Sequence, residues 1–293
     1  MPTATAIRSP GRLIADRYRL LHSVGAGGMA TVYRARDERL KRDVAVKVIA
    51  EPLARNPLFV RRFRAEADLC ARLAHRNVVA VLDAGMEPRD YIVMEFVHGV
   101  DAGTLLRREE LTSERAVGIL VQICGALAYV HSQGAVHHDV TPRNILVSRP
   151  GGTAKLADFG LASQVAGGPA SGLPNLIGTA GYVAPEILLG ASPSPRSDLY
   201  SLGVVAYRLL AGPSGAPSRD PEATAPRPTA APRMPPLGEA RPDLSRRLVQ
   251  AVQQALARDP GARQESVAQF GAQLVDAQSA LLEAARGELP RAA

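Results

Sequence analysis

The sequence predicts an α+β fold in which a small antiparallel β lobe is followed by a larger, mostly helical lobe. Between Tyr18 and Ile92, short β-branched runs alternate with glycine-containing turns, which is typical of antiparallel strands. From about Ala102 onward, apolar residues recur at helical spacing instead. With 293 residues and 46% hydrophobic content, the chain can bury one large core or two joined lobes.

The first lobe is expected over about residues 15–97, after a flexible tail at 1–14. One helical stretch at 57–75 should interrupt its strands, because apolar residues such as Phe63 and Cys70 follow helical spacing there. The strands themselves are expected in the runs YRLLHSVG, TVYRAR, DVAVKVIA, VVAVLDAG and YIVMEFV.

The second lobe is expected over about residues 98–286, with a C-terminal tail at 287–293. Its first long amphipathic helix should open at Ser113 and close at Gly134. Nine prolines lie between 213 and 242, which excludes an ordinary helix there and predicts an extended loop. Later helices are expected at 197–212, 244–260 and 266–285, with Ser197 and either Ser245 or Asp243 as N-caps.

Composition argues against a nucleic-acid partner, although the net charge is +7. The basic residues are almost all scattered arginines, and lysine occurs only at Lys41, Lys47 and Lys155. Aromatic residues make up only 4% of the chain, fewer than an RNA-binding surface would need.

No signal core or membrane span is expected either. The longest apolar run, 199–211, is interrupted by Arg208 and is shorter than the roughly 18 residues that a membrane helix needs. The two cysteines form neither a disulfide framework nor a metal-ligand spacing. We therefore expect a cytoplasmic protein without a membrane partner.

A glycine-rich turn, VGAGGMATV, lies between the first two expected strands. Glycines at such a turn let backbone N–H groups approach phosphates closely. A dinucleotide-binding site would need a helix after the turn, whereas a strand follows here. The candidate cofactor-binding residues of the turn are Val24, Gly25, Ala26, Gly27 and Gly28.

Lys47, in the run VAVK, lies 22 residues after Gly25 and could supply a positive charge to those phosphates. A carboxylate on a facing helix would hold the lysine, and Glu66 is the natural candidate. The alternative is that Lys47 and Glu66 are two solvated surface charges.

Two later segments, VHHDVTPRN (136–144) and KLADFGLA (155–162), carry oxygen-bearing side chains at loop positions. Asp139, Asn144 and Asp158 suit Mg²⁺, a hard cation that is held by carboxylates together with substrate phosphates. A zinc site at His137 and His138 is disfavoured, because adjacent residues of an extended loop point to opposite sides.

Together these segments resemble the eukaryotic-like (Hanks-type) serine/threonine protein kinases of bacteria, from about Tyr18 to Ala285. GAGGMATV is similar to the glycine-rich loop of the family, VAVK to its lysine motif, HHDVTPRN to its catalytic loop and DFG to its metal-binding motif. GTAGYVAPE (178–186) and SDLYSLG (197–203) also match, and Arg263 stands where the family pairs an arginine with Glu186. The resemblance implies a protein-kinase-like bilobal fold.

The resemblance also implies roles for the chemical groups. Asp139 would orient the substrate hydroxyl and accept its proton, and Lys47, held by Glu66, would bind the phosphates of ATP. Asn144 and Asp158 would hold Mg²⁺, for which Mn²⁺ could substitute.

For the adenine ring, the resemblance implies a pocket guarded by Met94. Glu95 and Val97 would offer backbone hydrogen bonds to adenine. The ring would be sandwiched by Val32, Ala45 and Leu146. A hydrophobic spine is implied at Phe159, His137, Cys70 and Val81.

The sequence departs from the family at two positions of the expected site. Ala30 replaces the third glycine of the loop, where bacterial members tolerate a small residue. Thr141 replaces the lysine that usually steadies the γ-phosphate, and this change bears on activity. Arg143 stands where many tyrosine kinases place an arginine with that task, so we expect it to compensate. Lys47, Asp139, Asn144 and Asp158 are all retained, which favours a working enzyme over the alternative, a pseudokinase that binds nucleotide or a partner.

Thr179, in GTAGY, matches the threonine that contacts the catalytic aspartate in serine/threonine kinases. The expected reaction is therefore transfer of the γ-phosphate of ATP to Ser/Thr hydroxyls of proteins, including autophosphorylation. His138 replaces the arginine that grips a phosphorylated activation loop, and the loop from Ser163 to Ile177 holds few acceptors. Activity is thus expected not to depend on phosphorylation of that loop.

Overall fold

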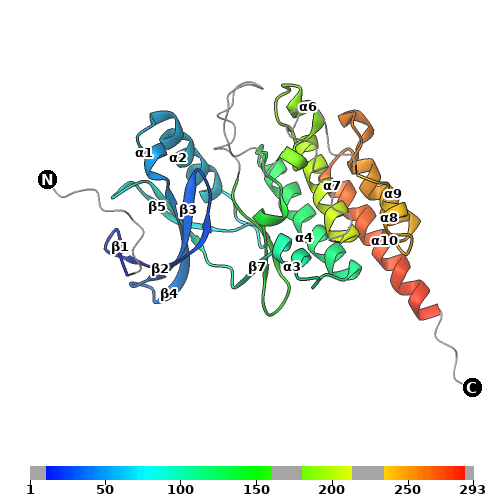
Figure 1. Cartoon of the computed structure of the whole chain (residues 1–293), viewed down its shortest axis with the longest axis horizontal. Coiled ribbons are helices and arrows are strands. Elements are labelled where there is room, and N and C mark those ends of the chain that lie inside the picture. The colour runs from blue at the N-terminus through cyan, green and yellow to red at the C-terminus, as the bar shows by residue number, and fades with distance from the viewer. Residues whose placement is uncertain (1–10, 160–179, 213–233, 288–293) are drawn as a thin grey trace, which may run out of the picture. The chain divides into compact units, whose positions relative to one another are not determined.

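The computed structural model describes residues 11–159, 180–212 and 234–287, and the chain divides into two compact units, 1–97 and 98–293. The first unit contains a six-stranded antiparallel sheet, and the second contains most of the helices (Figure 1). The predicted α+β class is confirmed.

The strands of the first unit lie in the order β1-β2-β3-β4-β6-β5, and every pair of neighbours is antiparallel. All five predicted strands are present. Leu13 and Ile14, expected in a tail, instead form a sixth strand, because Ile14 is fully buried in the cluster that contains Tyr18 and Leu20. The bounds are β1 (Leu13–Ile14), β2 (Tyr18–Ala26), β3 (Ala30–Asp37), β4 (Arg42–Ile49), β5 (Val81–Gly85) and β6 (Tyr91–Glu95).

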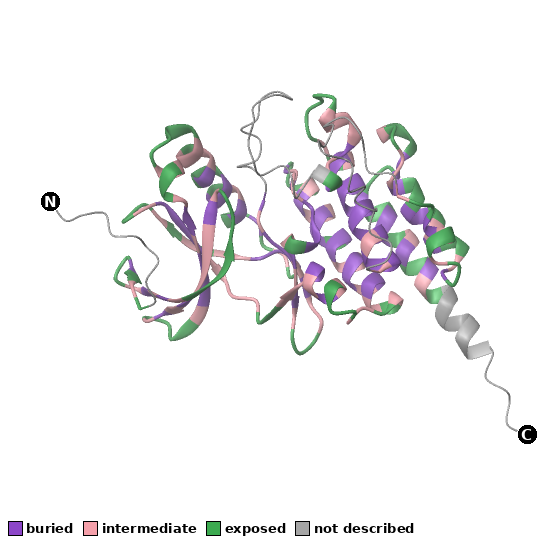
Figure 2. Ribbon diagram, in the orientation of Figure 1, coloured by how far each residue is buried: buried purple, intermediate pink, exposed green. Residues whose placement is uncertain are grey.

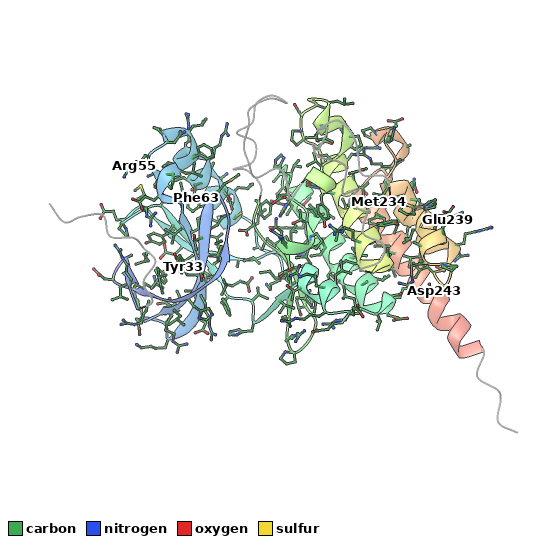
Figure 3. All side chains as sticks on the ribbon, in the orientation of Figure 1. Tyr33, Arg55, Phe63, Met234, Glu239 and Asp243 are labelled. Atoms are coloured by element: carbon green, nitrogen blue, oxygen red, sulfur yellow. The ribbon has the colours of Figure 1, made fainter. Side chains whose placement is uncertain are left out.

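Helix α2 (Pro57–Ala71) packs on one face of this sheet. Its Phe63, labelled in Figure 3, joins a buried cluster with Ile49 and Ile92. Asn56 caps the helix by accepting a hydrogen bond from the Leu58 N–H at 3.0 Å, and a proline follows at the first helical position. The opposite face buries a separate cluster that includes Val44, Val46 and Val48.

A short helix, α1 (Glu51–Ala54), precedes α2 and was not predicted. Its N-cap residue is Ala50, whose side chain cannot accept a hydrogen bond, so the usual start signal is missing. The helix α2 also ends at Ala71, four residues before the predicted end.

The second unit combines a three-stranded antiparallel sheet with helices. The strands are β7 (Gly99–Asp101), β8 (Ile145–Ser148) and β9 (Ala154–Leu156). The helices are α3 (Ala102–Arg107), α4 (Ser113–Ser132), α6 (Pro185–Leu188), α7 (Pro195–Ala211), α8 (Leu237–Ala240), α9 (Arg246–Ala255) and α10 (Val267–Gly287). Short 3₁₀ turns occur at η1 (Pro142–Asn144), η3 (Ala180–Tyr182) and η5 (Pro260–Ala262).

Helix α7 forms the centre of the second unit and contacts α4, α9 and α10 (Figure 2). Every residue from Ser197 to Ala211 is buried except Arg208, which is half-buried. The contact with α9 is close: a Cβ added to Gly203 would lie 3.0 Å from the Ala255 Cβ, so only glycine fits without a shift.

Helix α4 begins at Ser113 as predicted, and Thr112 caps it by accepting from the Arg115 N–H at 3.2 Å. One of the predicted N-caps is wrong by three residues. Ser194, not Ser197, caps α7, and Ser197 returns the hydrogen bond in a capping box. Ser245 caps α9 as predicted, which excludes Asp243.

Among the described helices, α4 is long and apolar enough to cross a membrane by length and composition alone. It packs against α7, α10 and β9, and half of its apolar window is buried, as in the core helix of a globular unit. Most of the proline-rich segment predicted at 213–242 lies outside the described residues, and its described end contains α8.

Candidate active site

The glycine-rich turn joins β2 to β3 and is closed by a 3.0 Å hydrogen bond from the Gly27 N–H to the Ala30 carbonyl. A Cβ added at Gly25 would meet nothing within 4 Å, and one at Gly27 would meet only the Ala30 oxygen at 3.9 Å. Neither glycine has a left-handed φ. The fold of the hairpin therefore does not require glycine at either position, and the missing side chains leave the backbone there open to close approach.

Five of the predicted nucleotide-binding positions share one face of the sheet. Gly25 pairs with Val32 across β2 and β3, and Val32 pairs with Lys47 across β3 and β4. Ala45, two residues before Lys47, pairs with Met94 on β6. Since cross-strand partners and residues two apart point to the same side, these positions form a continuous patch.

Lys47 and Glu66 form the ion pair expected from the sequence. The Lys47 Nζ donates to Glu66 Oε1 at 2.6 Å, and their side chains are only 13% and 5% exposed. The interpretation as two solvated surface charges is therefore wrong. The lysine also lies 6.0 Å from the centre of the Phe63 ring. A buried charge pair of this kind fixes the ammonium group on the sheet face that carries the glycine-rich turn.

The segment after β6 carries the predicted adenine contacts. The Glu95 backbone is held by Ala80, which accepts from the Glu95 N–H at 3.0 Å and donates to Glu95 Oε1 at 2.9 Å. Val97 is half-buried at the end of the first unit. Leu146 belongs to the second unit, on β8 between Asp101 and Lys155. Val24 is half exposed.

In the second unit, Asp198 of α7 holds the loop that contains Asp139. Its Oδ2 accepts from the His137 N–H at 2.8 Å, and its Oδ1 accepts from the His138 N–H at 3.0 Å. The same carboxylate contacts His131 Nε2 at 2.8 Å. His138 adopts a left-handed φ of 71°, which is unusual for a residue with a side chain and which these hydrogen bonds hold in place.

Asn144 fixes the carboxylate of Asp139. Its Nδ2 donates to the Asp139 backbone carbonyl at 2.8 Å and to Asp139 Oδ2 at 2.9 Å. The Asn144 carbonyl in turn accepts from the Ala157 N–H at 2.8 Å, which brings the segment with Asp158 alongside. Asp158 also has a left-handed φ, 55°. The predicted trio of Asp139, Asn144 and Asp158 is thus collected on two adjoining loops.

The donor set of these loops fits a hard cation. The Asn144 amide nitrogen is committed to Asp139, so the amide oxygen is the atom of that group suited to a metal. With Asp158 it offers oxygen ligands of the kind that Mg²⁺ takes. The described residues contain no group of three or more His, Cys, Asp and Glu side chains placed to hold a metal.

His137 instead holds neighbouring segments together through its ring. Its Nε2 contacts the Ala157 carbonyl at 3.1 Å, its Nδ1 accepts from the Asp139 N–H at 3.3 Å, and its ring lies 4.6 Å from the Phe159 ring. Complete burial lowers the pKa of His137 to about 4, so the ring is neutral near pH 7. Cys70 and Val81, the other predicted spine positions, belong to the first unit.

Outside the loops, Arg263 and Glu186 form the predicted ion pair, with two hydrogen bonds of 2.7 Å each.

Arg143 is exposed and lies in η1, directly before Asn144. Thr179 and the loop from Ser163 to Ile177 lie outside the described residues.

Sequence reasoning did not assign a role to Asp198. Its only signal was its place in the segment SDLYSLG, because the groups that it binds lie about 60 residues earlier in the chain.

The sheet with its glycine-rich turn and buried lysine, and the loop that carries Asp139, are the parts expected of one class of protein, the phosphotransferases that use a nucleotide. Residues 18–270 match the protein kinase domain family. The chain belongs to the protein kinase family.

Known relatives agree with this assignment. Serine/threonine-protein kinase PknB of Mycobacterium tuberculosis is 41% identical over 271 residues, covering 89% of this chain and 43% of the relative. PknA of the same organism is 42% identical over 209 residues, covering 69% of this chain and 48% of the relative. The chain thus spans less than half the length of these relatives. The crystal structure of the M. tuberculosis PknI kinase domain is similar, with a TM-score of 0.72 and 31% identity over 92% of this chain and 99% of that domain.

Proposed function

We propose that this chain transfers the γ-phosphate of ATP to serine and threonine hydroxyls of protein substrates, including its own. The observation that carries the proposal is the Asp139 carboxylate, which Asn144 holds at 2.9 Å on a loop tied to α7 by Asp198. Family membership and the names of the relatives support it.

In the proposed mechanism, Asp139 orients the substrate hydroxyl and accepts its proton as the oxygen attacks the γ-phosphorus. Lys47, held by Glu66, and the backbone of the glycine-rich turn position the phosphates. Arg143 steadies the transferring group in place of the lysine that Thr141 replaces. Asn144 and Asp158 would hold Mg²⁺, or Mn²⁺ in its place, which neutralises charge on the phosphates.

The finer assignments rest on the family pattern. Thr179 matches the threonine that contacts the catalytic aspartate in serine/threonine kinases, which supports a serine/threonine rather than a tyrosine acceptor. Val32, Ala45 and Leu146 would enclose adenine, Met94 would close the back of its pocket, and Glu95 and Val97 would supply backbone hydrogen bonds. We place the reaction in the cytoplasm, where ATP is supplied, without a nucleic-acid or membrane partner.

The test is incubation of the purified chain with labelled ATP and MgCl₂, alone and with a generic protein substrate. Wild type should transfer label, and Asp139→Asn and Lys47→Met should each lower turnover by at least roughly 10²-fold. Lys41→Met, at an exposed lysine, is the matched control and should retain full activity.

The competing proposal is a pseudokinase that binds nucleotide or a partner without transfer. Binding of ATP without any transfer of label would establish it. Transfer that persists in Asp139→Asn would show that the catalytic base has been misassigned.

A further inference from the structure

Arg34 of β3 lies on the sheet face that carries the predicted nucleotide-binding positions. It comes two residues after Val32 and pairs with Ala45 on β4, and Ala45 pairs in turn with Met94 on β6. Since cross-strand partners and residues two apart point to the same side, the Arg34 side chain starts beside the positions expected to enclose adenine. A flat, uncharged ring is enclosed by apolar side chains, so a cation at the border of that enclosure needs another explanation.

Asp43 fixes the direction of the Arg34 side chain. Arg34 Nε and Nη2 both donate to Asp43 Oδ2, at 3.0 and 2.5 Å. Arg36 Nη1 donates to the other oxygen, Asp43 Oδ1, at 3.1 Å. The hydrogen bond from Arg34 is the largest cause that lowers the pKa of Asp43, so the carboxylate is charged near neutral pH. The Arg34 side chain is 35% exposed, but it is held at two nitrogens, which restricts its rotamers.

The guanidinium of Arg34 lies over the ring of Phe96. Its central carbon is 5.1 Å from the ring centre, which is the distance of a cation–π contact. The register of the sheet explains this meeting. Val44 pairs with Glu95, so Asp43 and Phe96 are the next residues in line at the edge of β4 and just beyond β6. The carboxylate that holds the arginine and the ring that receives it therefore lie side by side.

Phe96 is the middle residue of the segment expected to bind adenine through the backbone of Glu95 and Val97. β6 ends at Glu95, so the next two residues lie beyond the paired strand. The Glu95 end is held by Ala80, which accepts from the Glu95 N–H at 3.0 Å and donates to Glu95 Oε1 at 2.9 Å. The contact with Arg34 adds an anchor at the following residue. Backbone groups that are oriented before a ligand arrives bind it more tightly, because less ordering is left to do.

We infer that Arg34 is a positioning residue for nucleotide binding: held by Asp43, it stacks on Phe96 and fixes the backbone that receives the adenine ring. The inference rests on the proposed kinase function, from which it takes the adenine contacts. Arg34 acts through Phe96 and touches neither the phosphates nor the reacting atoms. Its effect therefore falls on affinity for the adenine part of ATP and not on the transfer step.

The experiment titrates the intact chain by calorimetry with ATP, adenosine and inorganic tripolyphosphate, and measures KM and kcat with labelled ATP. In Arg34→Met, the Kd of adenosine and the KM for ATP should each rise about threefold, as for loss of one partly exposed cation–π contact, while kcat is kept. The Kd of tripolyphosphate should not change, since that probe has no adenine ring. A general effect of the lost positive charge would instead weaken tripolyphosphate and spare uncharged adenosine.

Arg36→Met is the matched control. It removes an arginine from the same strand and the same carboxylate but leaves Arg34 over Phe96, so all three probes should keep their wild-type Kd. Phe96→Leu should raise the Kd of adenosine, and Arg34→Met should have no further effect in that background, because the contact is already gone. A merely disrupted sheet would lower the thermal midpoint and weaken adenosine and tripolyphosphate together.

An adenosine Kd that is unchanged in Arg34→Met, or raised as much in Arg36→Met, overturns this inference and leaves the kinase function intact. An equal rise for adenosine and tripolyphosphate, or full additivity of Arg34→Met and Phe96→Leu, overturns it as well. Absence of transfer by the wild-type chain overturns the kinase function, whereas adenosine binding, which calorimetry measures without transfer, still decides the role of Arg34.

Discussion

Arg263 donates a hydrogen bond of 2.7 Å from each terminal nitrogen of its guanidinium to the two carboxylate oxygens of Glu186. The Arg263 side chain is fully buried. The same guanidinium donates to the backbone carbonyls of Ala257 and Arg196 at 2.8 Å each. One side chain thereby ties α6 to the start of α7 and to the end of α9.

Removal of one partner of this pair should destabilise the second unit strongly. Arg263→Met leaves the Glu186 carboxylate and the carbonyls of Ala257, Arg196 and Arg258 without their donor, and we expect a loss of about 3–5 kcal/mol in the free energy of unfolding. Urea denaturation measures it. Arg19→Met, which breaks a partly exposed pair with Glu38, is the control and should cost no more than about 1 kcal/mol. A loss of equal size in both variants would contradict the assigned difference in burial.

Arg143 should matter for turnover and not for stability. It is exposed in η1, and we expect it to supply the charge of the missing lysine, so Arg143→Ala should lower kcat by roughly 10²–10³. Adding Thr141→Lys to that variant should restore part of the rate, because a cation from either position reaches the same phosphate. Steady-state kinetics beside a thermal melt separates the two effects. An unchanged kcat in Arg143→Ala would refute the idea that Arg143 compensates for the missing lysine, but it would not contradict the kinase function.

His137 should make stability depend on pH. Its pKa is about 4 in the folded chain, below the ordinary 6.5, because burial disfavours the charged ring. The unfolded chain binds the proton first, so the free energy of unfolding should fall as pH drops from about 6.5 to 4, by about 3 kcal/mol in all. In His137→Tyr this part of the slope should disappear, whereas His22→Tyr, at an exposed histidine, should keep it. Urea midpoints at a series of pH values give the slope, and identical slopes in all three proteins would refute the assignment.

His138 bears on regulation. Burial lowers its pKa, so the ring is neutral near pH 7 and offers no permanent charge to a phosphorylated loop. We therefore predict that activity does not depend on phosphorylation of the segment from Ser163 to Ile177. Phosphatase treatment, checked by mass, should leave initial rates unchanged, and so should Ser171→Ala. A large drop in both samples, reversed by preincubation with ATP only in the phosphatase-treated one, is the contrary result.

The sequence determined the features that local patterns carry. β-branched runs and glycine turns located the strands of the first unit, and helical spacing located α2, α4, α7, α9 and α10, because each pattern is complete within a dozen or so residues. Lys47, Glu66, Asp139, Asn144 and Asp158 were found through residue type and order along the chain. The pairs Lys47–Glu66 and Arg263–Glu186 followed, since each partner lies in a recognisable segment.

The sequence did not settle the ends of helices and strands where two neighbouring residues could each serve as the end. Ser194 and Ser197 are both good N-cap residues, and each donates or accepts for the other in the same capping box, so composition alone could not choose between them. The strand at Leu13–Ile14 is too short to show alternation and exists because its pairing with Tyr18 and Arg19 buries Ile14.

Only the tertiary structure decided which residues far apart in the sequence form hydrogen bonds with each other. Asp198 meets His137 and His138 across about 60 residues, and Arg208 meets Tyr182 across 26. Such contacts leave no periodicity in the chain, because they depend on how α7 packs within the second unit and not on the neighbours of either residue. The hydrogen bonds that fix the loop of Asp139 belong to this class, since they are created by the packing of one buried helix.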